Sequence, residues 1–273
     1  MPRIAVLCLN RIIKPQIPLE EFLRFTADLG IKYVEVRNDF TDKGVLDGLS
    51  DGAVQKAFTD TSIQALTINA LYPFEDGRML MANLQKLKEL IAEAGRIRCP
   101  QIVMCPLNDA ADPRSPAQRA DELVAALNAY GPVFAEANMT GLIEPLGFPI
   151  CSLRTKKAAL EGIARCNYPD CYRLLHDTFH HYLSGETEFF PNQTAVVHVS
   201  GLLAGKSKAE TTDEDRVLVT RDDVMDNRGQ VATLLADGCT APISYEPFSS
   251  QVRSLPLPEL KAQLQQSIDY LFA

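Results

Sequence analysis

The chain has 273 residues, enough for one large domain or two ordinary ones, and its hydrophobic fraction of 46% is that of a packed globular protein. A formal net charge of −8 leaves no cationic surplus for binding nucleic acid or an anionic membrane surface. No apolar run reaches the roughly 18 residues that cross a membrane, and the first one is too short for a signal peptide. We therefore expect a cytoplasmic protein without nucleic-acid or membrane partners.

The cysteines suggest neither a disulfide framework nor a thiolate zinc site. Their number, seven, is odd, and no Cys-x-x-Cys spacing occurs. We predict that they are ordinary reduced thiols of the core.

Short apolar runs alternate along the chain with longer segments of helical period. Each run is nearly continuous in apolar residues, as expected for strands that are buried on both faces. The eight runs are Ile4–Asn10, Tyr33–Asn38, Ile63–Leu71, Gln101–Leu107, Gly141–Leu146, Tyr172–Asp177, Thr194–Ser200 and Pro242–Pro247.

Between these runs, apolar residues recur at steps of three and four, which indicates helices that cover a sheet on one side. Ser115 before Pro116, and Pro18 before two glutamates, mark helix starts. Gly30 and Gly95 are predicted to end two helices just before strands. The helical repeats are Phe22/Phe25/Leu29, Leu80/Leu84/Leu87/Ile91, Leu123/Leu127/Tyr130 and Leu260/Leu264/Ile268/Leu271.

Strict alternation of strand and helix implies parallel strands with right-handed crossovers. Eight such units in about 250 residues predict a single (β/α)8 TIM barrel over residues 1–273, with its active site at the carboxyl ends of the strands. An open doubly wound sheet is the second interpretation, and it has less support because no Gly-x-Gly-x-x-Gly turn follows the first strand. The polar segment Gly201–Asp215 is interpreted as an active-site loop after the seventh strand.

Four polar residues stand at the ends of the last four predicted strands: Glu144, Asp177, His198 and Glu246. Any one of them alone would more often be a helix cap, an ion-pair partner or a core histidine. Their recurrence in four consecutive strands places them around one point at the top of the barrel. Three carboxylates buried together require a positive partner, so the sequence predicts one divalent metal ion. One imidazole and three carboxylates suit Mn²⁺, Mg²⁺ or Co²⁺ and tolerate Zn²⁺.

Further residues are weaker candidates for contact with a substrate. His180 lies three residues after Asp177 and could face the same cavity, and Arg216 follows the polar loop and could reach a developing oxyanion. Glu35 and Asn69, near the ends of the second and third runs, are candidates for binding substrate hydroxyls. His176 and His181 are interpreted as structural, and Lys206 and Lys208 as solvated loop charges.

These motifs resemble the xylose-isomerase-like barrel superfamily of sugar isomerases and epimerases, in which Glu, Asp, His and Glu at the ends of strands five to eight bind a metal. Three segments resemble the 2-keto-myo-inositol (inosose) isomerases of inositol catabolism: Glu144–Pro149 with Ser152–Thr155 after it, His176–Tyr182 and Thr212–Leu218. The resemblance implies that Glu144, Asp177, His198 and Glu246 are metal ligands and that His180 and Arg216 bind the substrate. One departure concerns the loop beside Arg216, where Val219–Asp223 replaces the Pro-Gly-x-Gly that usually follows in these isomerases.

The resulting hypothesis is a proton shift on a hydroxyketone, in which Glu144 and Glu246 transfer the proton and His180 and Arg216 hold substrate oxygens. A small polyol or keto-sugar is the expected partner, and the oligomeric state stays open, homo-oligomers included. A dehydratase of the same superfamily is an alternative. A zinc-dependent DNA-repair endonuclease is disfavoured, because its multi-zinc site needs many more histidines than the four present and the acidic net charge does not suit DNA. A non-catalytic sugar-binding protein would not need the converging carboxylates.

Overall fold

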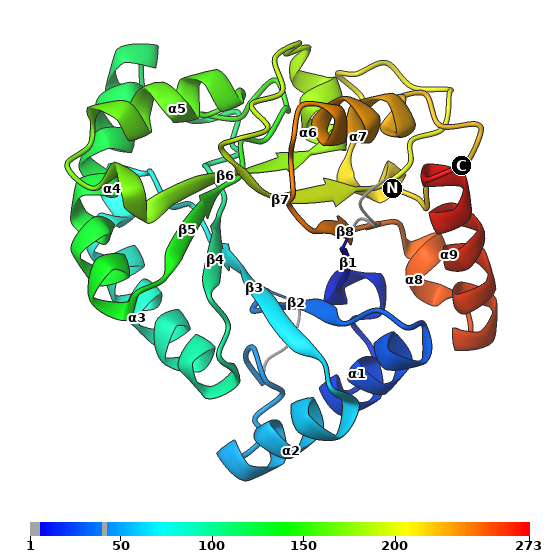
Figure 1. The fold of residues 1–273 in the computed structure, drawn as a ribbon. Helices are drawn as coiled ribbons and strands as arrows, with labels where there is room; N and C mark the ends of the chain where they lie inside the picture. The colour runs from blue at the N-terminus through cyan, green and yellow to red at the C-terminus, as the bar shows by residue number, and fades with distance from the viewer. Residues whose placement is uncertain (1–5, 40–42) are drawn as a thin grey trace.

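A computed structural model describes residues 6–39 and 43–273. Within these residues eight parallel strands close into one barrel, each pairing with the next in the chain and β8 with β1 (Figure 1). The predicted TIM barrel is therefore confirmed, and the doubly wound sheet is wrong. The strands are β1 (Leu7–Asn10), β2 (Tyr33–Arg37), β3 (Gln64–Leu71), β4 (Gln101–Met104), β5 (Thr140–Ile143), β6 (Tyr172–Asp177), β7 (Thr194–Val199) and β8 (Ile243–Tyr245).

Each predicted apolar run coincides with one strand, although β5 begins one residue before its run, and several runs extend past the strand end. The run Gln101–Leu107 leaves the sheet after Met104, and Pro242–Pro247 leaves it after Tyr245. Residues 4 and 5 of the first run lie outside the described residues. The additional residues form the loops at the carboxyl end of the barrel, where they are buried or partly buried although they are not in the ladder.

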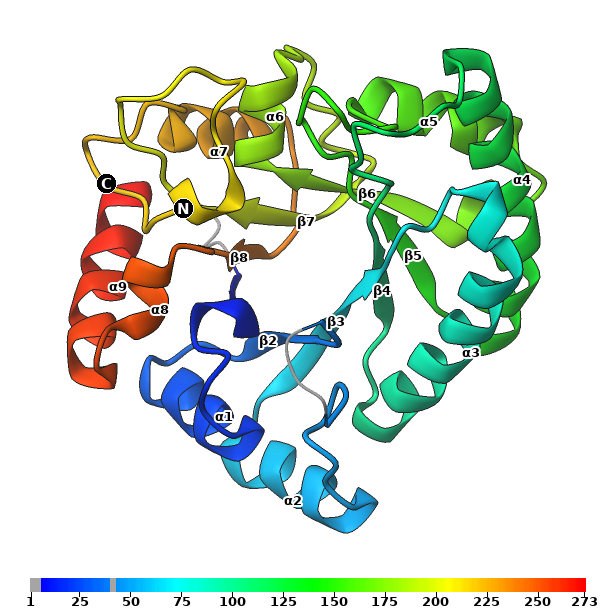
Figure 2. The ribbon, with the colours of Figure 1, turned by 180° about the vertical axis from the view of Figure 1, so that it is seen from behind.

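The helices surround the ring of strands, as the two opposite views show (Figures 1 and 2). They are α1 (Leu19–Asp28), α2 (Asp51–Thr61), α3 (Leu80–Ile97), α4 (Pro116–Ala137), α5 (Lys156–Arg165), α6 (Thr178–Ser184), α7 (Asn227–Ala236), α8 (Ser250–Ser254) and α9 (Leu257–Leu271). Short 3-10 helices are η1 (Arg11–Ile13), η2 (Gly77–Met79), η3 (Pro169–Cys171) and η4 (Asp213–Asp215).

Most of the predicted helix boundaries are confirmed. Ser115 caps α4 with a capping box, and Gly30 has a positive φ of 74° just after α1. The prediction for Gly95 is wrong, because this glycine lies inside α3. That helix ends instead at Arg98, which adopts the left-handed conformation with φ 54° and donates its N–H to the carbonyls of Ala94 and Gly95.

The barrel interior explains why the polar strand ends meet. An apolar cluster contains one buried residue from each of six strands, namely Cys8, Leu66, Val103, Leu142, Leu175 and Val196. Because side chains alternate between the two faces of a strand, the residue two positions further on points to the same side. Glu144, Asp177 and His198 each lie two positions after a member of this cluster. The interior is thus apolar in its middle and polar at its carboxyl end.

Two further predictions concern loops and thiols. The segment Gly201–Asp215 after β7 is irregular up to η4, as expected. All seven cysteines lie in the described part of the chain and are free thiols; five are buried as predicted, whereas Cys105 and Cys171 are only partly buried. Among the described residues no helix is long and apolar enough to cross a membrane.

Candidate metal centre

The four residues predicted to bind a metal come together at the carboxyl end of the barrel. Asp177 is the last residue of β6 and His198 the penultimate residue of β7, while Glu144 and Glu246 directly follow β5 and β8. One potential ligand atom from each side chain lies within 4.8 Å of the other three, and all four side chains are buried.

The Nδ1 atom of His198 is the meeting point of the cluster. It lies 3.0 Å from Glu246 Oε2, 3.2 Å from Glu144 Oε1 and 3.8 Å from Asp177 Oδ2. Ligand atoms that share one ion at about 2.1 Å stand about 3 to 4 Å from one another, so the spacing fits a single ion. Oxygen donors with one imidazole are a suitable set for a divalent cation.

Asp177 has two functions, one for each carboxylate oxygen. Its Oδ1 accepts hydrogen bonds from the backbone N–H groups of Phe179 and His180 and so caps α6. Its Oδ2 faces His198 and accepts a hydrogen bond of 2.6 Å from Arg216. The helix that follows β6 is therefore fixed to the cluster by the same side chain.

Two arginines balance the negative charge of the cluster. Arg216 also donates to Glu246 Oε2 at 3.0 Å, and Arg37 donates to Glu246 Oε1 at 2.8 Å. Burial by itself would raise the pKa of Glu246, but His198 and Arg216 lower it to about 2. Burial by itself would lower the pKa of His198, but Glu246, Glu35 and Glu144 raise it well above its usual value. Without a metal, the cluster is held together as a network of ion pairs.

Glu35 does not have the position that the sequence suggested. It was a candidate for binding substrate hydroxyls, but its side chain is fully buried and lies on the far side of His198, 2.9 Å from Nε2. The interior side chain two positions further on, Arg37, lines the cavity instead. An extended strand advances about 3.3 Å per residue, so two residues move a side chain from the layer below the centre to the cavity above it.

A cavity of about 380 Å³ opens above the cluster and is lined by Glu144, Glu246, Arg216 and His180, among others. His180 is buried in α6 and not at a solvent-exposed loop, and its Nδ1 has no hydrogen-bond partner among the described residues. An imidazole with an unpaired nitrogen at the cavity wall can bind a substrate oxygen. Asn69 also lines the cavity, while its amide donates to Glu35 and Thr67.

Three cavity residues that contact the cluster or Arg216 were not recognised in the sequence. Cys105 Sγ lies 3.3 Å from Glu144 Oε2, Arg37 binds Glu246, and the Phe248 ring lies 4.7 Å from the guanidinium carbon of Arg216. Arg37 ends a buried strand and Cys105 follows one, so strand position was a signal for both. For Phe248 the only signal in the sequence was its position two residues after Glu246.

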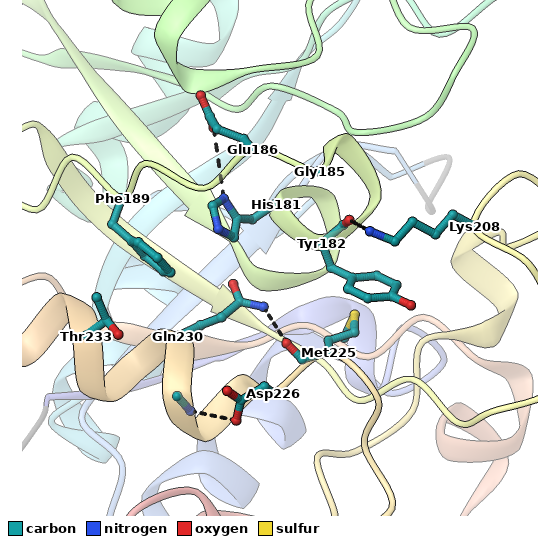
Figure 3. Close-up of a pocket in the computed structure, with 11 residues that line it drawn as sticks. His181, Tyr182, Gly185, Glu186, Phe189, Lys208, Met225, Asp226, Gln230 and Thr233 are labelled. Atoms are coloured by element: carbon teal, nitrogen blue, oxygen red, sulfur yellow. Dashed lines mark hydrogen bonds and ion pairs between the residues drawn. The ribbon is translucent and has the colours of Figure 1, made fainter.

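The other two histidines lie outside the centre, as predicted. His176 and His181 pack against Phe189, and His181 lines a separate pocket between α6 and α7 (Figure 3). His181 Nδ1 lies 2.7 Å from the buried Lys156 ammonium. Lys206 and Lys208 are both exposed, as predicted, and the ammonium of Lys208 also reaches the carbonyl and the ring of Tyr182.

A family model described as xylose isomerase-like TIM barrel matches residues 23–273. The chain belongs to this family. Members of the family share the barrel seen here, and each of the three segments that resembled inosose isomerases contributes residues to the cavity wall. No curated protein matches the chain in sequence.

Several solved structures share the fold. A xylose isomerase domain containing protein from Salmonella typhimurium LT2 is 31% identical, with a TM-score of 0.89 over 98% of both chains. The IolI protein, solved with a bound zinc atom, is 20% identical, with a TM-score of 0.87 over 97% of both chains. A D-psicose 3-epimerase solved in the presence of D-fructose is 12% identical, with a TM-score of 0.71 over 96% of both chains.

Proposed function

We propose that the chain is a divalent-metal-dependent isomerase or epimerase that moves a proton on a polyhydroxylated ketone, either an inosose or a keto-sugar. The observation that carries the proposal is the position of two carboxylates. Glu144 and Glu246 approach the same nitrogen of His198, at 3.2 and 3.0 Å, and both line the cavity. A substrate carbon in the cavity would have a proton-transferring group on each side.

Glu144, Asp177, His198 and Glu246 would hold the metal in this proposal. A bound divalent cation would supply Lewis-acid polarisation of the substrate carbonyl, which makes the neighbouring C–H acidic. The charge balance is suitable, since the three carboxylates of the cluster outnumber the two arginines, Arg216 and Arg37, that pair with them. Mn²⁺, Mg²⁺, Co²⁺ and Zn²⁺ all remain candidates.

In the proposed reaction, the side chains of the cavity accept and return the proton that moves. One glutamate accepts the proton from the carbon that bears the hydroxyl, and the C–H electron pair forms the double bond of an enediolate. The second glutamate returns a proton to the former carbonyl carbon in an isomerisation, or to the opposite face of the same carbon in an epimerisation. The hydroxyl proton passes to the other oxygen in the isomerisation, so no co-reactant is needed. Arg216 and His180 would bind the substrate oxygens as charge develops.

The relatives support this class of substrate. The D-psicose 3-epimerase structure was obtained with a ketohexose, D-fructose, and the IolI protein binds zinc. A cavity of about 380 Å³ is at the lower end of the usual range for small-molecule sites, which suits a substrate of about six carbons.

A dehydratase is the second candidate. The probable 3-DHS dehydratase AsbF from Bacillus anthracis has a TM-score of 0.72 over 95% of this chain, with 14% identity. It would begin with the same proton abstraction but would expel a hydroxyl from the enolate. Product analysis by mass spectrometry separates the two, because only the dehydratase gives a product lighter by one water.

The proposed mechanism is tested by running the reaction on inososes and ketohexoses in D₂O with added Mn²⁺. We expect solvent deuterium on the carbon next to the carbonyl, because a carboxylate proton exchanges with solvent between abstraction and return. Transfer of hydride between the carbons would instead retain the substrate's own hydrogen completely. Complete retention would contradict the proposed mechanism, provided that the variants below also keep their activity.

The variants are Glu144→Gln and Glu246→Gln, each of which keeps an oxygen ligand but loses the base. Both should lose nearly all turnover while retaining at least part of the metal. Glu75→Gln serves as the matched control, since Glu75 is an equally buried glutamate whose partners, Arg114 and Ser152, lie outside the cluster. Substantial activity in both site variants would exclude the two-glutamate mechanism.

A further inference from the structure

Glu35 is a fully buried carboxylate with no solvent contact and no place in the cavity wall. Its two oxygens accept hydrogen bonds from four neutral side chains and face the imidazole of His198. Asn69 donates at 3.1 Å and Thr67 at 2.6 Å to Oε2, while Asn10, at 3.3 Å, and Ser244 donate to Oε1. The His198 Nε2 atom lies 2.9 Å from Oε1 and 3.1 Å from Oε2.

The strand register builds this arrangement. Glu35 on β2 is paired with Asn10 on β1 and with Thr67 on β3, and His198 on β7 is paired with Ser244 on β8. These five residues belong to five strands, and their side chains meet inside the barrel just below the metal ligands. Burying a carboxylate without partners would be very unfavourable, so the four neutral donors stabilise Glu35 as a fixed anion at this place.

The position of Glu35 determines which nitrogen of His198 carries a proton. A carboxylate accepts hydrogen bonds only, so the nitrogen that faces it, Nε2, must be protonated. Nδ1 approaches the carboxylates of Glu144, Asp177 and Glu246, so it also carries a proton until a cation takes its place. The ring that binds a cation is neutral, and its lone pair is then on Nδ1. With the opposite tautomer, Nδ1–H would point at the metal position and Nε2 would repel Glu35.

We propose that Glu35 is a positioning residue for the metal centre: it holds the His198 ring and fixes the tautomer that presents the Nδ1 lone pair to the metal. This inference rests on the proposed metal site. A negatively charged hydrogen-bond acceptor also increases the donor strength of a metal-bound imidazole. Glu35 therefore sets metal affinity without contacting either metal or substrate.

The test compares Glu35→Gln with the control Glu75→Gln by titration with Co²⁺, followed by visible absorption of the ion. Gln keeps the shape and one acceptor oxygen but loses the charge. We expect the Kd for Co²⁺ to rise about 10-fold to 100-fold in Glu35→Gln, in the range seen when such outer partners are removed. Glu75→Gln should stay within about threefold of the parent chain, since Glu75 has the same chemistry and burial but does not contact His198.

The tautomer is read directly by NMR of the ¹¹³Cd-substituted chain labelled with ¹⁵N histidine. Coupling of ¹¹³Cd to Nδ1 of His198, with a proton on Nε2, is expected. Coupling to Nε2 would overturn the proposal, and so would an unchanged Kd in Glu35→Gln or an equal loss in Glu75→Gln. If Glu35→Gln does not fold, Ser244→Ala/Thr67→Val keeps the acid but removes two of its donors, and it should still weaken Co²⁺ binding several-fold. A parent chain that binds no metal would refute the proposed function itself, which is a different result from a parent that binds and a variant that binds equally well.

Discussion

Arg216 donates a hydrogen bond of 2.6 Å to Oδ2 of Asp177, the oxygen that also faces His198. The guanidinium packs against the rings of Phe179 and Phe248, with its central carbon 4.9 and 4.7 Å from their centres. Burial would lower the pKa of Arg216, but Asp177 and Glu246 raise it above its usual value, so the group stays a cation. It is therefore a fixed positive charge between the candidate metal ligands and the cavity.

Arg216→Ala should lower kcat/KM about tenfold to a thousandfold, which corresponds to roughly 1.4 to 4 kcal/mol for one lost charged donor. Metal content should not fall, because the oxygens of Asp177 and Glu246 released by Arg216 are free to bind the cation. Steady-state kinetics and metal analysis measure the two effects separately. Arg216→Lys keeps the charge without the two-pronged geometry and should be intermediate. Unchanged kinetics in the alanine variant would remove Arg216 from the substrate site.

Asp177→Asn should weaken metal binding at least tenfold and reduce activity accordingly, while α6 remains folded. Asparagine is as good an N-cap as aspartate, so the hydrogen bonds from Phe179 and His180 can persist after the charge is lost. Asp226→Asn is the matched control, because Asp226 caps α7 through the Gly229 N–H and lies outside the cluster. Calorimetric titration with Mn²⁺ gives the affinities, and circular dichroism checks the helices. Equal binding by both variants would contradict the assignment of Asp177 as a ligand.

Cys105 should matter through its hydrogen bond to Glu144. Cys105→Val removes the donor at nearly the same volume, and we expect kcat/KM to fall about twofold to tenfold, up to about 1.4 kcal/mol. Cys105→Ser keeps a donor and should lose less. The control Cys171→Val changes a thiol of similar exposure that contacts the Gly131 carbonyl. If all three variants had the parent kinetics, the thiol would not contribute to the orientation of Glu144.

His181 should make the fold less stable in mild acid. Burial and the nearby Lys156 lower its pKa from 6.5 to about 4, so the unfolded chain takes up a proton at this residue before the folded chain does. Stability is therefore complete above about pH 6.5 and falls as the pH drops toward 4. His181→Gln keeps an acceptor for Lys156 but cannot titrate, so it should flatten this part of the pH profile. Urea unfolding in chelator between pH 4 and 8 measures the difference. The pKa values of the neighbouring His176 and Glu186 are also lowered, so both residues likewise reduce stability in acid. Because the parent and the variant both contain them, their contribution cancels in the comparison.

The arrangement of the barrel and its four converging side chains could be predicted from the sequence. Continuous apolar runs alternating with one-sided helices leave few topologies, and parallel strands bring their carboxyl ends to one edge. Position along a strand was therefore enough to predict that Glu144, Asp177, His198 and Glu246 lie close together. Gly95 shows the limit of local signals, since α3 continues through it to make apolar contacts further on.

Only the tertiary structure decided what lies opposite what across the barrel. The sequence gives the spacing along one strand, but the register between strands sets the height at which residues of different strands meet. That height separates Glu35, which faces His198 from below, from Arg37, which reaches Glu246 in the cavity two residues later. It also brings Cys105 to Glu144 and Arg216 to Asp177, pairs 39 positions apart in each case. Such contacts depend on how eight strands close into one ring, and no local pattern in the chain contains that information.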